Sequence, residues 1–147
     1  MQDILKKPFR LHNTIQHYKW GSVPPDALIP QLLGIEGEKN TAYAELWMGA
    51  HSSGSSKIYI ENELLPLNDL IHRFPGLILG DEVARRFDNK LPFLFKVLSA
   101  AETLSIQTHP SRGQAELLRR NDPRHYPDTN HKPEIAIALD SLTALAG

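Results

Sequence analysis

The residue types best suited to chemistry lie in two short stretches of the second half of the chain. The first is Gln-Thr-His-Pro at 107–110, at the end of a strand expected over 104–109. Alternate residues of a strand project to one side, so Gln107 and His109 are expected to share a face. Such a pair can supply two ligands to one metal. The ordinary alternative is a half-buried histidine beside a surface amide.

The second stretch is Asn-His-Lys-Pro-Glu at 130–134, where a polar loop leads into an apolar strand expected over 134–139. Glu134 opens that strand, and a carboxylate near a core is unfavourable without a partner. It is either a ligand or a strand-edge side chain exposed to water. His131 is a further ligand candidate, but Pro133 separates it from the strand and favours a place at the rim. With Gln107 and His109, Glu134 would complete a set of one nitrogen and two oxygen donors that suits Zn²⁺.

The composition limits the classes of protein to which the chain can belong. Its 147 residues are enough for one compact domain with its own core. The net charge of −1 argues against nucleic-acid and anionic-membrane partners. The chain has no cysteine, which excludes disulfides, cysteine zinc sites and thiol catalysis. No apolar run is long enough for a signal peptide or a membrane span, so we expect a cytoplasmic protein.

The elements that must position these residues are short. Eleven prolines interrupt the chain and disfavour a helical bundle. The pattern predicts a mainly β fold with peripheral helices, of jelly-roll or barrel type. Strands are expected within 9–18, 41–49, 57–60, 93–100, 104–109 and 134–139. Helices are expected over 27–33 with Asp26 as N-cap, over 67–74, over 81–87, and over 111–120 with a capping box between Ser111 and Gln114.

Five blocks of the sequence resemble the type I mannose-6-phosphate isomerases, in the order and spacing of that family. They are YKWG at 18–21, AELWMGAH at 44–51, LPFLFKVL at 91–98, LSIQTHP at 104–110 and NHKPE at 130–134. The similarity runs from about Phe9 to the last residue. A lone QxHP is a weak signal, whereas the five blocks together are highly specific. One departure is Ser52, which stands where the family usually has proline and puts the rigidity of that loop in doubt.

The resemblance implies a cupin-type jelly roll, of which residues 1–147 would be a single domain, the N-terminal part of the catalytic domain. The family's helical insertion and C-terminal β domain would be absent. One Zn²⁺ per chain would be bound by Gln107, His109 and Glu134. The family's fourth ligand, a histidine, and its catalytic arginine lie further along and have no counterpart before Gly147. Activity of this chain alone is therefore in question.

The implied reaction is the aldose–ketose interconversion of mannose 6-phosphate and fructose 6-phosphate, through an enediol whose developing oxyanion the zinc would stabilise. This step links glycolysis to mannose activation and GDP-mannose biosynthesis. The base stays open between Lys132, Glu134 and a group outside the chain. Lys96 and Lys132 are the expected anion contacts; the alternatives are an edge-strand lysine that reaches water and a solvated loop lysine.

Three further residues are candidate substrate contacts. Ser105 is expected on the face of the metal ligands, as a donor to phosphate or as a strand serine bonded to backbone. Glu45 is expected near the sugar, although a core Trp47 paired with this carboxylate explains the pattern almost as well. Trp20 either flanks the site or packs in the core. No chemical role is expected for His12, His17, His72 and His125, and His51 is undecided.

Two other functions compete with the isomerase. One is a sugar-phosphate-binding cupin fragment without turnover. The other is a different cupin metalloenzyme such as an iron dioxygenase, whose usual pair of close histidines before a glycine-bounded turn is lacking. In either case the expected partner is a small-molecule sugar phosphate, with no nucleic acid or membrane. The sequence leaves the oligomeric state open, and a monomer is favoured.

Overall fold

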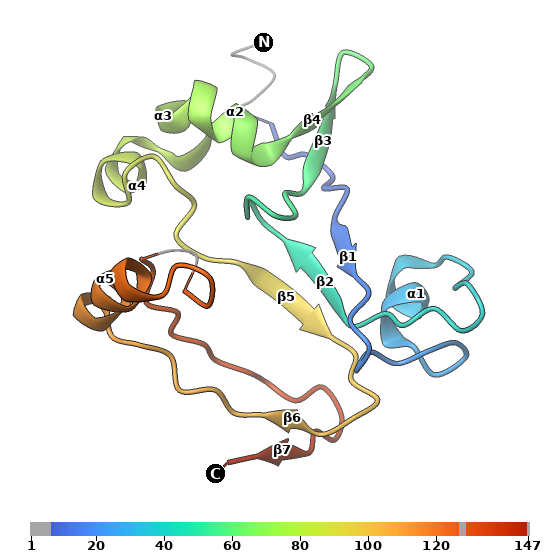
Figure 1. Cartoon of the computed structure of the whole chain (residues 1–147). Helices are drawn as coiled ribbons and strands as arrows, with labels where there is room; N and C mark the ends of the chain where they lie inside the picture. The colour runs from blue at the N-terminus through green and yellow to red at the C-terminus, as the bar shows by residue number, and fades with distance from the viewer. Residues whose placement is uncertain (1–6, 127–128, 147) are drawn as a thin grey trace. The chain divides into compact units, whose positions relative to one another are not determined.

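The computed structural model describes residues 7–126 and 129–146, which combine sheets and helices (Figure 1). The described residues fall into two compact units, one within Met1–Ala101 and one within Glu102–Gly147. Seven strands and five helices are found in the part of the chain that is described. None of these helices is long and apolar enough to cross a membrane.

The first unit is built around an antiparallel sheet of β1 (Thr14–Gln16), β2 (Glu45–Met48) and β5 (Phe95–Leu98), with β2 in the centre. Its central strand carries three consecutive buried residues, Glu45, Leu46 and Trp47. Helix α1 (Leu28–Leu33) contributes Ile29 to the same core as Leu46. Because both faces of β2 are covered, the carboxylate of Glu45 must form its hydrogen bonds and ion pairs with other groups of the protein.

A hairpin and three short helices complete this unit (Figure 1). The hairpin joins β3 (Lys57–Ile60) to β4 (Glu63–Pro66), and both turn residues have positive φ, 49° at Glu61 and 70° at Asn62. Such a two-residue turn matches the twist of the strands that it joins. It is followed by α2 (Leu67–Arg73), α3 (Pro75–Leu79) and α4 (Asp81–Arg86). Leu70 of α2 packs on Ile58 and Ile60 of β3 to form a second core cluster.

The second unit contains one longer helix and a pair of very short strands. Strand β6 (Leu104–Ser105) pairs in parallel with β7 (Ala144–Leu145). Helix α5 (Arg112–Asn121) begins at the expected cap, where the Ser111 amide and hydroxyl both donate to Gln114 Oε1, at 3.0 and 2.8 Å. The predicted capping interaction is therefore confirmed.

Several predicted elements differ from the structure. The strand expected over 104–109 ends at Ser105, and no strand forms over 134–139, where Ile135 is 91% and Ile137 81% exposed. A strand needs a neighbour to satisfy its backbone groups. No described strand pairs with 134–139, and the bonding of the first segment to β7 ends with the Ile106 amide, which donates to the Leu145 carbonyl at 2.8 Å.

The other differences are local. The α1 cap is Ala27 rather than Asp26, and it makes no side-chain hydrogen bond. Strand β4 and helix α3 were not predicted; in α3, Pro75 occupies the first turn, where its missing N–H costs nothing.

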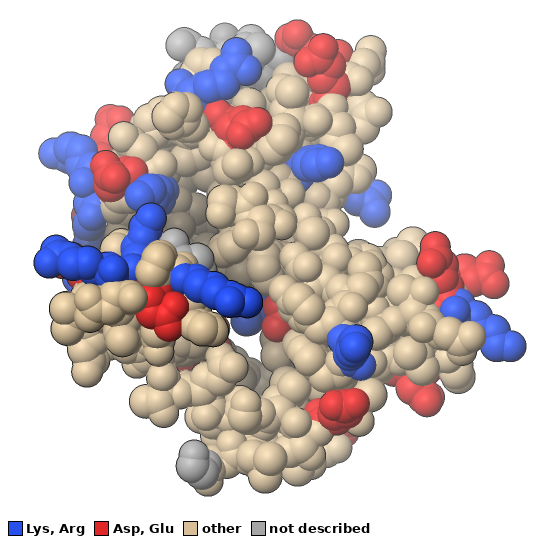
Figure 2. All heavy atoms as spheres, in the orientation of Figure 1, with Lys and Arg blue, Asp and Glu red and all other residues tan. Residues whose placement is uncertain are grey.

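Charged side chains of both signs lie on one face of the molecule (Figure 2). On the face drawn in Figure 2, Lys and Arg side chains are interspersed with Asp and Glu. This distribution agrees with the net charge of −1 and gives that face no field of a single sign. An anionic substrate would therefore have to be bound by individually placed cations.

Candidate functional site

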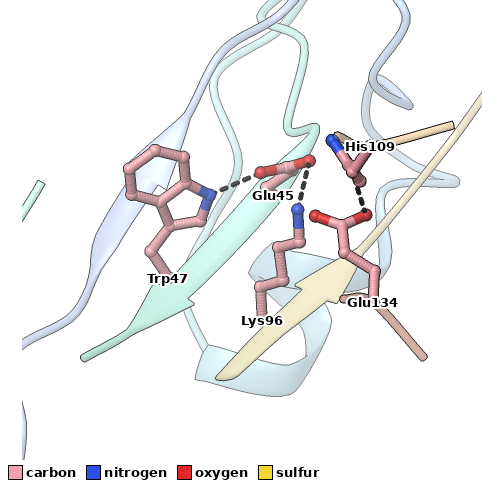
Figure 3. A network of polar contacts seen from close by, with 5 residues as sticks. All are labelled: Glu45, Trp47, Lys96, His109 and Glu134. Carbon is pink, nitrogen blue, oxygen red and sulfur yellow. Dashed lines mark hydrogen bonds and ion pairs between the residues drawn. The ribbon is translucent and has the colours of Figure 1, made fainter. Parts of the chain in front are cut away.

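In the second unit, His109 faces Glu134, with 3.7 Å between Nε2 and Oε2 (Figure 3). The Nε2 atom is buried and has no hydrogen-bond partner among the described residues. A buried polar atom without a partner is unfavourable and needs an explanation. Two ligands of one tetrahedral zinc ion stand roughly 3.4 Å apart, from metal–ligand distances of about 2.1 Å. The spacing and the buried nitrogen are compatible with a pair of metal ligands, and equally with an ion pair between the two side chains.

A cavity of about 300 Å³ in this unit brings Gln107 and His109 together with Asn130 and Lys132. The two stretches singled out in the sequence therefore meet at one cavity. Their meeting does not come from strand alternation, because 107–109 lie beyond the end of β6. The irregular segment after this strand places both residues in the lining of the cavity.

Of the three predicted metal ligands, His109 provides an imidazole and Glu134 a carboxylate. Among residues 7–126 and 129–146 there is no group of three His, Cys, Asp or Glu that could hold a metal ion. The third predicted ligand, Gln107, is an amide and falls outside those four types. The donor set is compatible with zinc, and the full ligand set stays a prediction.

His125, to which sequence reasoning gave no chemical role, also lines this cavity. Its Nδ1 lies 2.7 Å from Asp122 Oδ2, just beyond the C-terminal end of α5. The hydrogen bond from the His125 side chain is the main reason why the pKa of Asp122 is lowered. The signal available in the sequence was the Asp–His spacing of three residues after a helix.

We expect Asp122→Asn to remove part of the pH dependence of stability. Because the pKa of Asp122 is lower in the folded chain, its contribution is present above the ordinary carboxyl value of about 4 and is lost as the pH falls through the folded value. The variant should have a lower urea midpoint than the parent at about pH 6, and the two should converge near about pH 2. Asp140→Asn, at an exposed position, is the control. A midpoint difference that is constant with pH would contradict this assignment.

In the first unit, a buried carboxylate connects an indole and a lysine (Figure 3). Trp47 Nε1–H donates to Glu45 Oε2 at 2.5 Å, and Lys96 Nζ lies 3.7 Å from Glu45 Oε1. Glu45 is 7% exposed, and the Lys96 side chain is 28% exposed although β5 is an edge strand of its sheet. Lys96 is thus held against the protein by an ion pair and does not extend fully into water.

The other candidate residues named from the sequence have the following contacts. Trp20 stacks on Tyr18, with ring centroids 5.8 Å apart, and Ser105 is an exposed residue of β6. The His51 ring packs edge-on against the Trp47 ring, with 4.9 Å between the ring centroids. The loop that contains Ser52 is closed by a hydrogen bond from the Gly54 amide to the His51 carbonyl, at 3.0 Å.

Comparison with known families gives one match over nearly the whole chain. Residues 8–147 match the model of the phosphomannose isomerase type I catalytic domain. The mannose-6-phosphate isomerase of Saccharomyces cerevisiae is 40% identical over 148 residues, which cover 96% of this chain and 34% of the relative. That of Mus musculus is 44% identical over 146 residues, covering 95% and 34%. The chain thus spans about a third of the length of these relatives.

Solved structures give the same result for the fold. A mutant phosphomannose isomerase from Salmonella typhimurium superposes with a TM-score of 0.73 at 41% identity, covering 84% of this chain and 32% of the other. A zinc-bound mannose 6-phosphate isomerase superposes with a TM-score of 0.72 at 40% identity, covering 84% and 33%.

Proposed function

This chain belongs to the type I phosphomannose isomerase family, and we propose that it supplies part of an enzyme that interconverts mannose 6-phosphate and fructose 6-phosphate. The family match over residues 8–147 is the observation that carries the proposal. In this proposal residues 1–147 form the N-terminal part of the catalytic domain, an incomplete cupin-type jelly roll. The reaction would link glycolysis to GDP-mannose formation in the cytoplasm.

The proposed metal is a single Zn²⁺ held by Gln107, His109 and Glu134. Support comes from the buried and unpartnered Nε2 of His109, from its distance to Glu134, and from the cavity that it shares with Gln107. A bound zinc ion supplies a Lewis acid for the oxygen that becomes negative in the enediol. It would be one ion per chain.

The protein side chains would bind the sugar phosphate and move one proton between C2 and C1. Lys96 and Lys132 are proposed as contacts for substrate oxygens or phosphate, because each is a cation with three donors. Ser105 and Trp20 remain proposed substrate contacts. Lys132 and Glu134 are the proposed catalytic residues of this chain, and either could serve as the base that takes the proton.

The experiment compares the 147-residue chain with a chimera in which the matched region of the yeast relative is replaced by this chain. Zinc content and conversion of mannose 6-phosphate are measured for both proteins. We expect zinc-dependent turnover in the chimera. A folded, zinc-loaded chimera without turnover would refute the isomerase proposal. If sugar-phosphate binding is retained in that case, the protein is a binding module without turnover. The cavity of the second unit, which Lys132 helps to line, would then be the binding site.

A further inference from the structure

We propose that Glu45 and Trp47 are positioning residues for Lys96, so that Glu45 acts on the lysine and does not itself bind the sugar. The indole N–H fixes the carboxylate, and the carboxylate fixes the ammonium (Figure 3). This assigns Glu45 a role different from the substrate contact expected from the sequence. The functional consequence rests on the proposed contact between Lys96 and the sugar phosphate.

The register of the central sheet brings the three side chains together. Glu45 and Trp47 are alternate residues of β2 and share one face. In the antiparallel pair of β2 and β5, Lys96 lies directly opposite Trp47, and Glu45 lies opposite Leu98. Lys96 is therefore the diagonal neighbour of Glu45, within the reach of two long side chains.

Both oxygens of the Glu45 carboxylate are already engaged. Oε2 accepts the indole N–H at 2.5 Å, and Oε1 faces the Lys96 ammonium at 3.7 Å. A carboxylate that is 7% exposed needs such partners, since burying it unpaired is strongly unfavourable. The hydrogen bond from the Trp47 N–H to the carboxylate is charge-assisted, a type that is stronger than a neutral hydrogen bond.

The indole itself is fixed by the loop that follows β2. His51 packs edge-on against the ring, with centroids 4.9 Å apart and an interplanar angle of 74°. Gly54 lies so close that a Cβ there would be 3.0 Å from Trp47 Cε3 and 3.0 Å from Gln16 Nε2. Contacts with His51 and Gly54 therefore restrict the Trp47 ring, and the direction of its N–H does not depend on a bound substrate.

The test measures how tightly the Lys96 side chain is held in the 147-residue chain, using carbon-13 relaxation of the lysine ε-methylene groups. Trp47→Phe removes the N–H but keeps an aromatic ring, and Glu45→Gln keeps the shape but removes the charge. Lys90, whose exposed pair with Asp88 spans 3.6 Å, is the internal reference. Asp88→Asn is the matched control variant.

We expect the Lys96 order parameter to exceed that of Lys90 in the parent and to fall measurably in both variants. The Asp88→Asn change should leave the Lys96 order parameter as it is in the parent. The proposal is overturned if Lys96 stays ordered in a Trp47→Phe or Glu45→Gln chain whose amide spectrum remains native. Since either variant suffices, loss of folding in one still leaves the other as a test.

A second measurement separates this proposal from the proposed function. In the yeast chimera, Trp47→Phe is expected to raise KM for mannose 6-phosphate by about tenfold, with a much smaller change in kcat, because it disturbs a binding contact. Loss of Lys96 order with an unchanged KM would refute the substrate contact of Lys96 and leave the positioning role established. A parent chimera without any turnover would count against the isomerase proposal alone.

Discussion

Replacing His109 by alanine is expected to abolish zinc retention in the chimera, with a loss of affinity of at least about 100-fold. His109 is the only nitrogen donor of the proposed set, and changes in the groups around a metal's ligands already weaken binding by about 10- to 100-fold. Zinc per chain is measured after dialysis, and affinity by competition with a chromophoric chelator. Isomerase turnover should disappear together with the metal.

His125→Ala is the matched control, because His125 lines the same cavity but is not a proposed ligand. It should retain zinc. Unchanged zinc content in the His109→Ala protein would refute the ligand assignment. Loss of zinc in both variants would instead show that the cavity, rather than one donor, is required.

The second large effect is expected from Gly21→Ala. A Cβ at this position would lie 2.6 Å from the Ala44 nitrogen, 2.7 Å from its Cα and 2.8 Å from its Cβ. These neighbours are mostly backbone of the chain that leads into β2, which cannot move aside like a flexible side chain. We expect a loss of about 3 kcal/mol in the free energy of unfolding, at the upper end of overpacking effects.

Urea unfolding followed by circular dichroism measures this loss. Gly113→Ala is the control, since a Cβ there meets nothing within 4 Å and the residue lies in α5. It should be neutral or stabilise by up to about 0.5 kcal/mol. Equal stability of Gly21→Ala and the parent would show that β2 can shift to accept the methyl group.

Elements stabilised by nearby residues could be predicted from the sequence. Strand β3 has the predicted bounds, and α5 begins at the predicted Ser111 cap with Gln114 as its partner. Helices α2 and α4 each end one residue before the predicted limit. Capping bonds and helical periodicity involve residues only a few positions apart, so their energetics are visible in the sequence.

Strands that depend on distant partners were predicted less well. The apolar alternation of Ile135 and Ile137 indicates a strand, yet no described strand pairs with the segment, which stays irregular and exposed. In the segment 106–109, the described backbone bonding to β7 ends with the Ile106 amide, which donates to the Leu145 carbonyl at 2.8 Å. A strand's backbone bonds go to another segment, and no local pattern says whether that segment is there.

The sequence by itself determined the family, because five ordered blocks and an uninterrupted NHKPE do not depend on geometry, and it supplied the candidate residues of the site. Only the tertiary structure decided what those residues touch. It placed Gln107 and His109 at one cavity without a strand, added His125 to the wall, and showed both Glu45 oxygens engaged by Trp47 and Lys96. Burial and ion pairing arise between segments far apart in the chain, so they exist only once the chain has folded.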